Sequence, residues 1–219
     1  RGLSYMEGGF WKDAEADFRE AIERRENDQR RARTYGLHFI DYFPHRELGL
    51  ALFKQGKTEE SVSEFAASLK TVESSKAQYY IDEARKQLLK KTGEDKLPPE
   101  LTIEKPASNT YLNRLEVEVS GVASDDGFIK EVRSGSSVYP IYVAQKKVPF
   151  AVKVQLKPGP NVIEVFARDL LGKETKTEVR VIVDQAGPVV SLDEVKPLEK
   201  GGARIRALSG TKTGFPRWP

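Results

Sequence analysis

Cysteine is absent from this 219-residue sequence, and histidine is scarce. Without cysteine the chain has no disulfides, thiolate zinc sites, covalently attached haem or cysteine nucleophiles. Its two histidines, His38 and His45, stand seven residues apart across Pro44, and no acidic or thiol ligand stands at a supporting spacing. We therefore expect neither a metal nor a cofactor.

Long apolar runs and a strong net charge are also lacking. No stretch approaches the roughly 18 uninterrupted apolar residues of a membrane-spanning helix. A formal charge of +3, with 38% hydrophobic and 32% charged residues, is typical of a soluble globular protein and too small for a nucleic-acid-binding domain. The densest basic group predicts a solvated helix end or, alternatively, a docking site for an acidic partner: Arg24, Arg25, Arg30, Arg31 and Arg33.

Catalytic motifs are missing as well. The sequence has no Gly-x-Ser-x-Gly elbow and no phosphate-cradling glycine-rich loop, and no motif surrounds either histidine. The acidic pairs Glu59–Glu60 and Asp125–Asp126 have neither the pocket nor the separation of glycosidase carboxylates. We expect the protein not to be an enzyme.

Apolar residues recur at helical spacing through residues 1–91. Ala14, Phe18, Ala21 and Ile22 fall on one helix face, and similar stripes run from Val62 and from Ala77. Ser75 can cap the last of these helices, and Gly93 can end it. This half is predicted to be helical.

An internal repeat links these stripes. Seven residues stand at the spacings of the tetratricopeptide consensus: Gly2, Tyr5, Gly9, Trp11, Ala14, Phe18 and Ala21. Leu48, Gly49, Gly56 and Phe65 recur at the same relative positions. Residues 1–91 therefore resemble a tetratricopeptide-repeat (TPR) protein, which implies two helical hairpins and a closing helix. The 47 residues from Gly2 to Gly49 exceed the roughly 34-residue period, so we expect an insertion around residues 27–42.

The resemblance also implies a binding surface. In this family ligands lie along the concave face that the first helix of each hairpin builds. Carried over to this sequence, those positions are Leu3, Met6, Arg46, Leu50, Phe53, Lys54 and Tyr80. Such a mixed apolar and basic groove would favour a protein segment that carries an acidic residue.

The insertion itself is rich in aromatic residues: Tyr35, Phe39, Tyr42 and Phe43. One interpretation is that these rings cover the side of the helical array and fill the gap left by the long connection. The alternative is that they form the rim of a peptide-binding groove.

After a linker at residues 92–99 the apolar period changes to two. Leu115, Val117 and Val119 alternate with polar residues, and four similar segments precede or follow them between residues 100 and 185. Turn chemistry separates the predicted strands at residues 125–127, 158–161 and 171–173. Six or seven short strands in this length predict a β-sandwich.

Two stretches, SGVASDDGFIKEV and LKPGPNVIEVFARDLLGKETKTEVRVIVD, resemble bacterial immunoglobulin-like modules. The resemblance implies a spacer, adhesive or interaction unit without chemistry of its own. The fold class we expect is thus α plus β, with helical TPR-like hairpins followed by an all-β immunoglobulin-like sandwich.

Four aspartates stand in or beside the predicted turns: Asp125, Asp126, Asp169 and Asp184. Aspartate in a turn commonly bonds its own backbone, and we expect that role here. The alternative is a hard-cation site, since calcium takes several oxygens from flexible loops, although no EF-hand spacing is present.

Residues 186–219 repeat the character of the sandwich's opening strands, as if an incomplete second module began there. Two strands alone are marginal in water, so this segment is expected either to pack on the first sandwich or to add a strand to a neighbouring subunit. Ala203, Ile205 and Ala207 are the candidate donated strand, and a homo-oligomer would result.

The leading functional hypothesis is a protein-binding scaffold or assembly component of a bacterial cell envelope, either periplasmic or on the cell surface. The chain starts at Arg1 without a leader, so we expect a targeting segment or other sequence to precede it. One rival is a carbohydrate-binding or adhesive module that uses Tyr139 and Tyr142. Another is a non-catalytic fragment of a larger protein.

Overall fold

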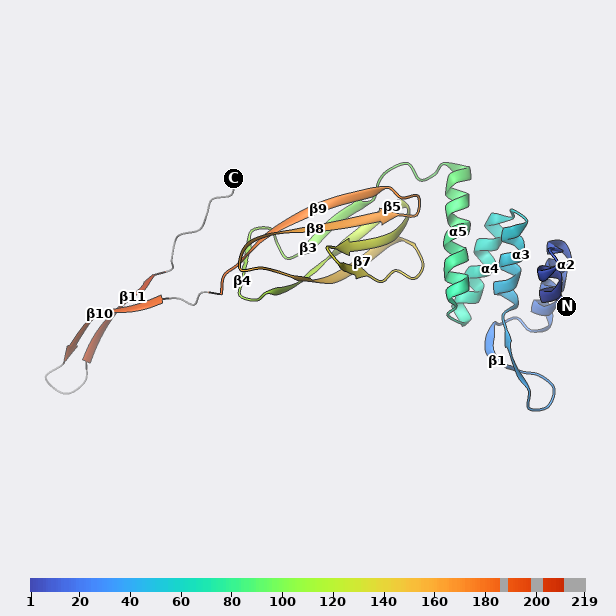
Figure 1. The fold of residues 1–219 in the computed structure, drawn as a ribbon, viewed down its shortest axis with the longest axis horizontal. Coiled ribbons are helices and arrows are strands. Elements are labelled where there is room, and N and C mark those ends of the chain that lie inside the picture. Colours follow the sequence, from blue (N-terminus) through green and yellow to red (C-terminus); the bar gives the residue numbers. More distant parts are fainter. Residues whose placement is uncertain (186–188, 198–202, 211–219) are drawn as a thin grey trace.

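The computed structural model of the chain describes residues 1–185, 189–197 and 203–210, the last two ranges by their backbone. It has a helical part followed by a β-sandwich, so the expected α plus β class is confirmed (Figure 1). No helix among these residues has both the length and the apolar character required to cross a membrane.

The helical part consists of five α-helices stacked side by side, with α5 between the other helices and the sandwich (Figure 1). Their bounds are α1 Gly2–Glu7, α2 Trp11–Arg24, α3 Pro44–Lys54, α4 Thr58–Thr71 and α5 Ser75–Thr92. Ser74, one residue before the position that the sequence indicated, caps α5 by accepting a hydrogen bond from the Ala77 amide. Gly93 ends this helix in the left-handed conformation, as expected.

One packing contact occurs twice in this array. A Cβ on Gly2 would lie 2.8 Å from the Phe18 ring, and a Cβ on Gly49 would lie 2.9 Å from the Phe65 ring. In both cases the glycine and the phenylalanine are 16 residues apart. The phenylalanines are buried, so each glycine lets two helices approach more closely than any side chain would permit.

The insertion between α2 and α3 is an antiparallel hairpin of two strands, β1 Gln29–Arg33 and β2 Phe39–Tyr42. Asp28, just before β1, is buried, and its carboxylate accepts hydrogen bonds from the amides of His45 (3.0 Å) and Arg46 (3.3 Å). These amides belong to the first turn of α3, which has no side-chain cap of its own. The hairpin therefore begins with the residue that caps the next helix.

Seven strands fold into the β-sandwich: β3 Glu100–Lys105, β4 Thr110–Leu112, β5 Glu116–Ser134, β6 Ser137–Tyr139, β7 Gln145–Gln155, β8 Gly159–Asp169 and β9 Glu174–Val183. β5 is the organising strand, since its first half pairs with β3 and β7 and its second half with β6 and β8. Val119, Ile129, Val132, Val165 and Val181 are fully buried between the layers.

The turn predicted at residues 125–127 does not form, because these residues belong to a strand. Asp125, Asp126 and Gly127 lie inside β5, where the pairing register shifts between Ser124 and Ile129. The same residue types that make turns also make irregularities within a strand, and here the bend carries β5 from one set of partners to another. The turn predicted at residues 171–173 does separate β8 from β9. Of the turn predicted at residues 158–161, only Pro158 lies between β7 and β8, because β8 already begins at Gly159.

Beyond the sandwich, β10 Val189–Pro197 and β11 Ala203–Gly210 form a separate two-stranded antiparallel sheet. The candidate donated strand thus pairs within its own chain, because Ala203, Ile205 and Ala207 face Pro197, Val195 and Leu192. The rest of the predicted second module, residues 186–188, 198–202 and 211–219, lies outside the described residues.

A buried carboxylate joins the two halves. Asp82 on α5 accepts hydrogen bonds from the Lys130 ammonium on β5 (2.6 Å) and from the Ala144 amide before β7 (3.0 Å). Arg85, one turn further along α5, donates to the Ala144 carbonyl (2.7 Å), and its guanidinium lies 4.6 Å from the centre of the Phe128 ring. Burial lowers the pKa of Arg85, and the charge of Asp82 opposes this shift.

Apolar side chains complete this interface. Leu89 near the end of α5 is buried with Ala144 and Leu170 of the sandwich, and Phe128 and Leu171 pack at the edge of the same cluster. α5 is therefore packed against the end of the sandwich from Asp82 to Leu89, by apolar as well as polar contacts.

Replacing Gly49 by valine should destabilise the protein by about 1–3 kcal/mol, because the added methyls overlap a buried ring that cannot move away. Chemical denaturation of the two proteins measures the difference. The exposed Ala16→Val on α2 is the control for the helix propensity of valine and should change stability by less than about 0.5 kcal/mol. Equal effects of the two variants would show that the crossing is not tight at Gly49.

Replacing Asp82 by alanine should lower stability by about 2–4 kcal/mol, because it leaves the Ala144 amide and the Lys130 ammonium without their acceptor. Calorimetry should then show separate unfolding of helices and sandwich. The neighbouring Glu83→Ala removes the same charge at a partly exposed position and should leave one transition. A single transition in Asp82→Ala would mean that the apolar contacts suffice to couple the halves.

Candidate functional site

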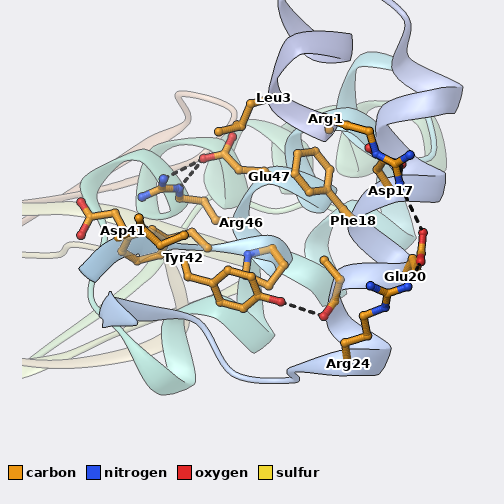
Figure 2. Close-up of a pocket in the computed structure, with 15 residues that line it drawn as sticks. Arg1, Leu3, Asp17, Phe18, Glu20, Arg24, Asp41, Tyr42, Arg46 and Glu47 are labelled. Atoms are coloured by element: carbon orange, nitrogen blue, oxygen red, sulfur yellow. Dashed lines mark hydrogen bonds and ion pairs between the residues drawn. The ribbon is translucent and has the colours of Figure 1, made fainter. Parts of the chain in front are cut away.

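A cavity of about 440 Å³ opens between α1, α2, the hairpin strand β2 and the start of α3 (Figure 2). Its floor is apolar, since Phe18 and Phe43 are buried beneath it together with Pro44. Leu3 and Ile40 stand at its two edges, where 58% and 49% of their surfaces are exposed. The cavity thus offers apolar surface both at its base and at its mouth.

Tyr42 fixes the wall that the hairpin contributes. Its hydroxyl donates to the Ala21 carbonyl at 2.7 Å and lies 3.0 Å from the Arg25 carbonyl, both in or just after the last turn of α2. The Arg25 guanidinium lies 5.5 Å from the centre of the tyrosine ring. Burial raises the pKa of the Tyr42 hydroxyl, so this donor stays protonated at neutral pH.

Ion pairs line the rim (Figure 2). Arg1 lies 3.7 Å from Asp17 and 3.9 Å from Glu20 across the gap from α1 to α2. Glu20 also accepts a hydrogen bond from Arg24.

On the opposite side of the rim, Arg46 donates to Glu47 at 2.7 Å, and its guanidinium lies only 3.9 Å from the centre of the Phe43 ring. Glu47 is buried and also pairs with Lys76 of α5 at 2.6 Å. The arginines of the rim are therefore already neutralised by carboxylates. Asp41 is exposed, and no ion pair to it occurs within residues 1–185.

Two of the seven predicted concave-face residues, Leu3 and Arg46, line this cavity. The other five lie elsewhere: Met6 and Leu50 pack into the helical core, and Lys54 is exposed near the end of α3. Phe53 and Tyr80 form an edge-to-face pair with ring centroids 5.6 Å apart.

The four aromatic residues of the insertion lie in different places. Tyr42 and Phe43 line the cavity. Phe39 lies outside it, with the Arg31 guanidinium 5.3 Å from the centre of its ring. Tyr35, at the hairpin tip, is 96% exposed. Phe43 is buried beneath the cavity, whereas Tyr42 forms one of its walls.

Sequence reasoning missed the contribution of α2. Asp17, Phe18, Glu20 and Arg24 belong to a second helix of a hairpin, which the family resemblance does not assign to the concave face. They line the cavity because the β-hairpin β1–β2 folds back over α2. No local pattern in the sequence predicts this contact. The clue available was the long insertion, ending at Pro44, between the two repeats.

Comparisons with known proteins found structural similarity but no family. No protein-family model matches the chain, and no curated protein matches it. Among solved structures, the chain is similar to the fibronectin(III)-like modules of Clostridium thermocellum CbhA, with 22% identity and a TM-score of 0.32. This similarity covers 41% of the present chain and 48% of the other, about half its length.

Replacing Tyr42 by phenylalanine removes the hydroxyl that holds the hairpin to α2, at a cost of about 1 kcal/mol. The hairpin should then open more often, and trypsin should cut after the arginines of β1 several times faster than in the parent protein. The highly exposed Tyr35→Phe should be cut at the parent rate. Unchanged proteolysis of Tyr42→Phe would mean that other contacts hold the hairpin closed.

Proposed function

We propose that this chain is a non-enzymatic protein-binding module, and that the cavity between α1, α2, β2 and α3 receives a segment of a partner protein. The observation that carries the proposal is the apolar floor of Phe18 and Phe43 with exposed Leu3 and Ile40 at its mouth. A cavity of about 440 Å³ lies in the lower part of the range of ligand pockets. It suits one or two large apolar side chains presented by a short peptide segment.

The rim indicates which charges the partner segment should carry. The sequence alone favoured a basic groove and an acidic ligand, but each rim arginine is paired with a carboxylate. The exposed carboxylate of Asp41 is the group best placed to gain a new charge partner. We therefore expect an apolar anchor residue flanked by a lysine or arginine.

The repeated contact of a crossing glycine with a phenylalanine 16 residues later supports the view that the helices are TPR-like hairpins. In that view the protein is a scaffold or assembly component, and the sandwich positions the helical array. The resemblance of the sandwich to bacterial immunoglobulin-like modules favours a periplasmic or cell-surface location, which fractionation of the producing cell would test.

The carbohydrate-binding alternative relies on Tyr139 and Tyr142. Tyr139 packs against the sandwich core, while Tyr142 is exposed in the segment before β7. Because one of the two rings is committed to the core, the pair does not offer a flat stacking platform, and we favour the protein-binding hypothesis.

Selection from a random peptide library on the whole protein tests this function. Selected peptides should share an apolar residue next to a basic one and bind with micromolar dissociation constants, as a small surface predicts. Ile40→Asp and Leu3→Asp should each weaken binding at least tenfold, because a carboxylate at the mouth opposes apolar contact. Asp41→Asn should reduce the preference for the basic residue.

Val162→Asp is the matched control, since Val162 is 48% exposed on β8 of the sandwich. It should bind the selected peptides with the parent affinity. Peptides that bind all variants equally would place the site elsewhere, and binding to a glycan array that Tyr142→Ala abolishes would favour the carbohydrate-binding alternative.

A further inference from the structure

Acidic side chains converge where the linker after α5 meets the sandwich. Asp95 comes from the linker, Asp125 and Asp126 from the irregular part of β5, and Asp169 from the end of β8. The side chains of Asp95 and Asp169 have no exposed surface. Asp184, the remaining loop aspartate, follows the far end of β9 and does not join this group.

Three of these carboxylates have the spacing of ligands around one ion. Oxygen atoms of Asp95, Asp125 and Asp126 all lie within 4.8 Å of one another. Two oxygens bound to a calcium ion at about 2.4 Å are at most about 4.8 Å apart. Taken in pairs, the three oxygens are therefore close enough to share one calcium ion.

Unpaired oxygens provide an independent sign of a missing partner. Oδ2 of Asp95 and Oδ1 of Asp125 are buried, and neither has a hydrogen-bond partner within the described part of the chain. Asp95 Oδ2 belongs to a fully buried side chain and lies beside Gly127, next to the oxygens of Asp125. A buried carboxylate oxygen without a partner is costly, so a bound cation would relieve a real deficit.

The ammonium group of Lys173 neutralises only part of this charge. It contacts Asp95 Oδ1, donates to the Leu97 carbonyl at 2.7 Å and lies 3.4 Å from Asp169 Oδ2. Burial, followed by the charge of Asp169, raises the pKa of Asp125 to about 6. Lys173 thus contacts two of the four carboxylates, Asp95 and Asp169, while Asp95 Oδ2 and Asp125 Oδ1 have no hydrogen-bond partner among the described residues.

Backbone contacts hold the oxygens in place. Asp126 accepts hydrogen bonds from the amides of Lys96 (3.0 Å) and Leu97 (3.3 Å), which ties the linker to β5. The Gly127 amide donates to Asp125 at 2.9 Å. A Cβ on Gly127 would lie 2.7 Å from Asp95 Oδ2, so only glycine allows the linker carboxylate to approach this closely.

We propose that Asp95, Asp125 and Asp126 bind a calcium ion, with Asp169 and Lys173 beside it setting its affinity. Calcium fits because every candidate ligand is an oxygen and because its coordination geometry is flexible, whereas zinc and copper prefer nitrogen or sulfur. The ion crosslinks the linker to β5 and so fixes the direction in which α5 leaves the sandwich. The sequence led us to expect no metal because Asp95 was not among the candidate ligands. This residue lies in the linker, outside any predicted turn.

Calcium added to the whole protein after chelator treatment tests the site. Calorimetric titration should show one ion per chain, and calcium at about 100 times its dissociation constant should raise Tm by about 5–10 °C. Magnesium at the same concentration should give less than half this shift, because it demands a stricter octahedron. Asp95→Asn and Asp125→Asn should each weaken calcium binding at least about tenfold.

Two further variants separate a bound ion from a purely structural cluster. Glu94→Gln removes an exposed charge next to Asp95 and should bind calcium like the parent. Lys173→Gln removes the competing ammonium and should tighten calcium binding by about tenfold or more. Absence of binding heat and of a Tm shift in the parent at millimolar calcium would overturn the proposal, as would equal binding by Asp95→Asn or a Lys173→Gln variant that is only less stable.

Discussion

The arrangement of the molecule depends on the buried carboxylate of Asp82. One side chain on α5 accepts from a lysine and from a backbone amide of the sandwich, while Arg85 on the same face returns a hydrogen bond to the Ala144 carbonyl. Loss of one partner would leave an uncompensated buried charge, so these contacts favour a single relative placement of helices and sandwich. Packing of Leu89 against Leu170 buries additional apolar surface at this interface. It does little to fix the orientation of the two halves, because hydrophobic contacts are not directional.

Much of the fold could be predicted from local periodicity. The change from period 3.6 to period 2 near residue 92 separates helices from strands, and the glycine–phenylalanine pairs mark the helix crossings. Two features could not be predicted this way. The hairpin at residues 29–42 has strands of five and four residues, too short for a clear alternation. The bend in β5 uses the residue types of a turn, and only pairing with distant strands distinguishes the two.

The candidate sites were less predictable because both are assembled from distant segments. Leu3 and Arg46 were found through the family resemblance, but the cavity exists because Tyr42 bonds the end of α2, 17 to 21 residues earlier in the sequence. Asp95 is an ordinary linker residue in the sequence, 30 residues before Asp125. It becomes a buried carboxylate only when the linker folds over Gly127. Local patterns contain no information about contacts of this kind.

The two sites are separated along the axis of the molecule, which has a consequence for how they would act together. The cavity lies among α1, α2 and α3, whereas the aspartates lie beyond α5, with α4 and α5 between them (Figure 1). Substitutions at sites this far apart, without shared partners, usually have additive effects on free energy. An ion at the aspartates would therefore leave the intrinsic affinity of the cavity unchanged and would instead restrict where the helical array points. Suppose that the partner is attached to the same surface or assembly as the sandwich. If the fixed direction points the cavity toward this partner, the restriction raises the effective concentration of the cavity near the partner segment.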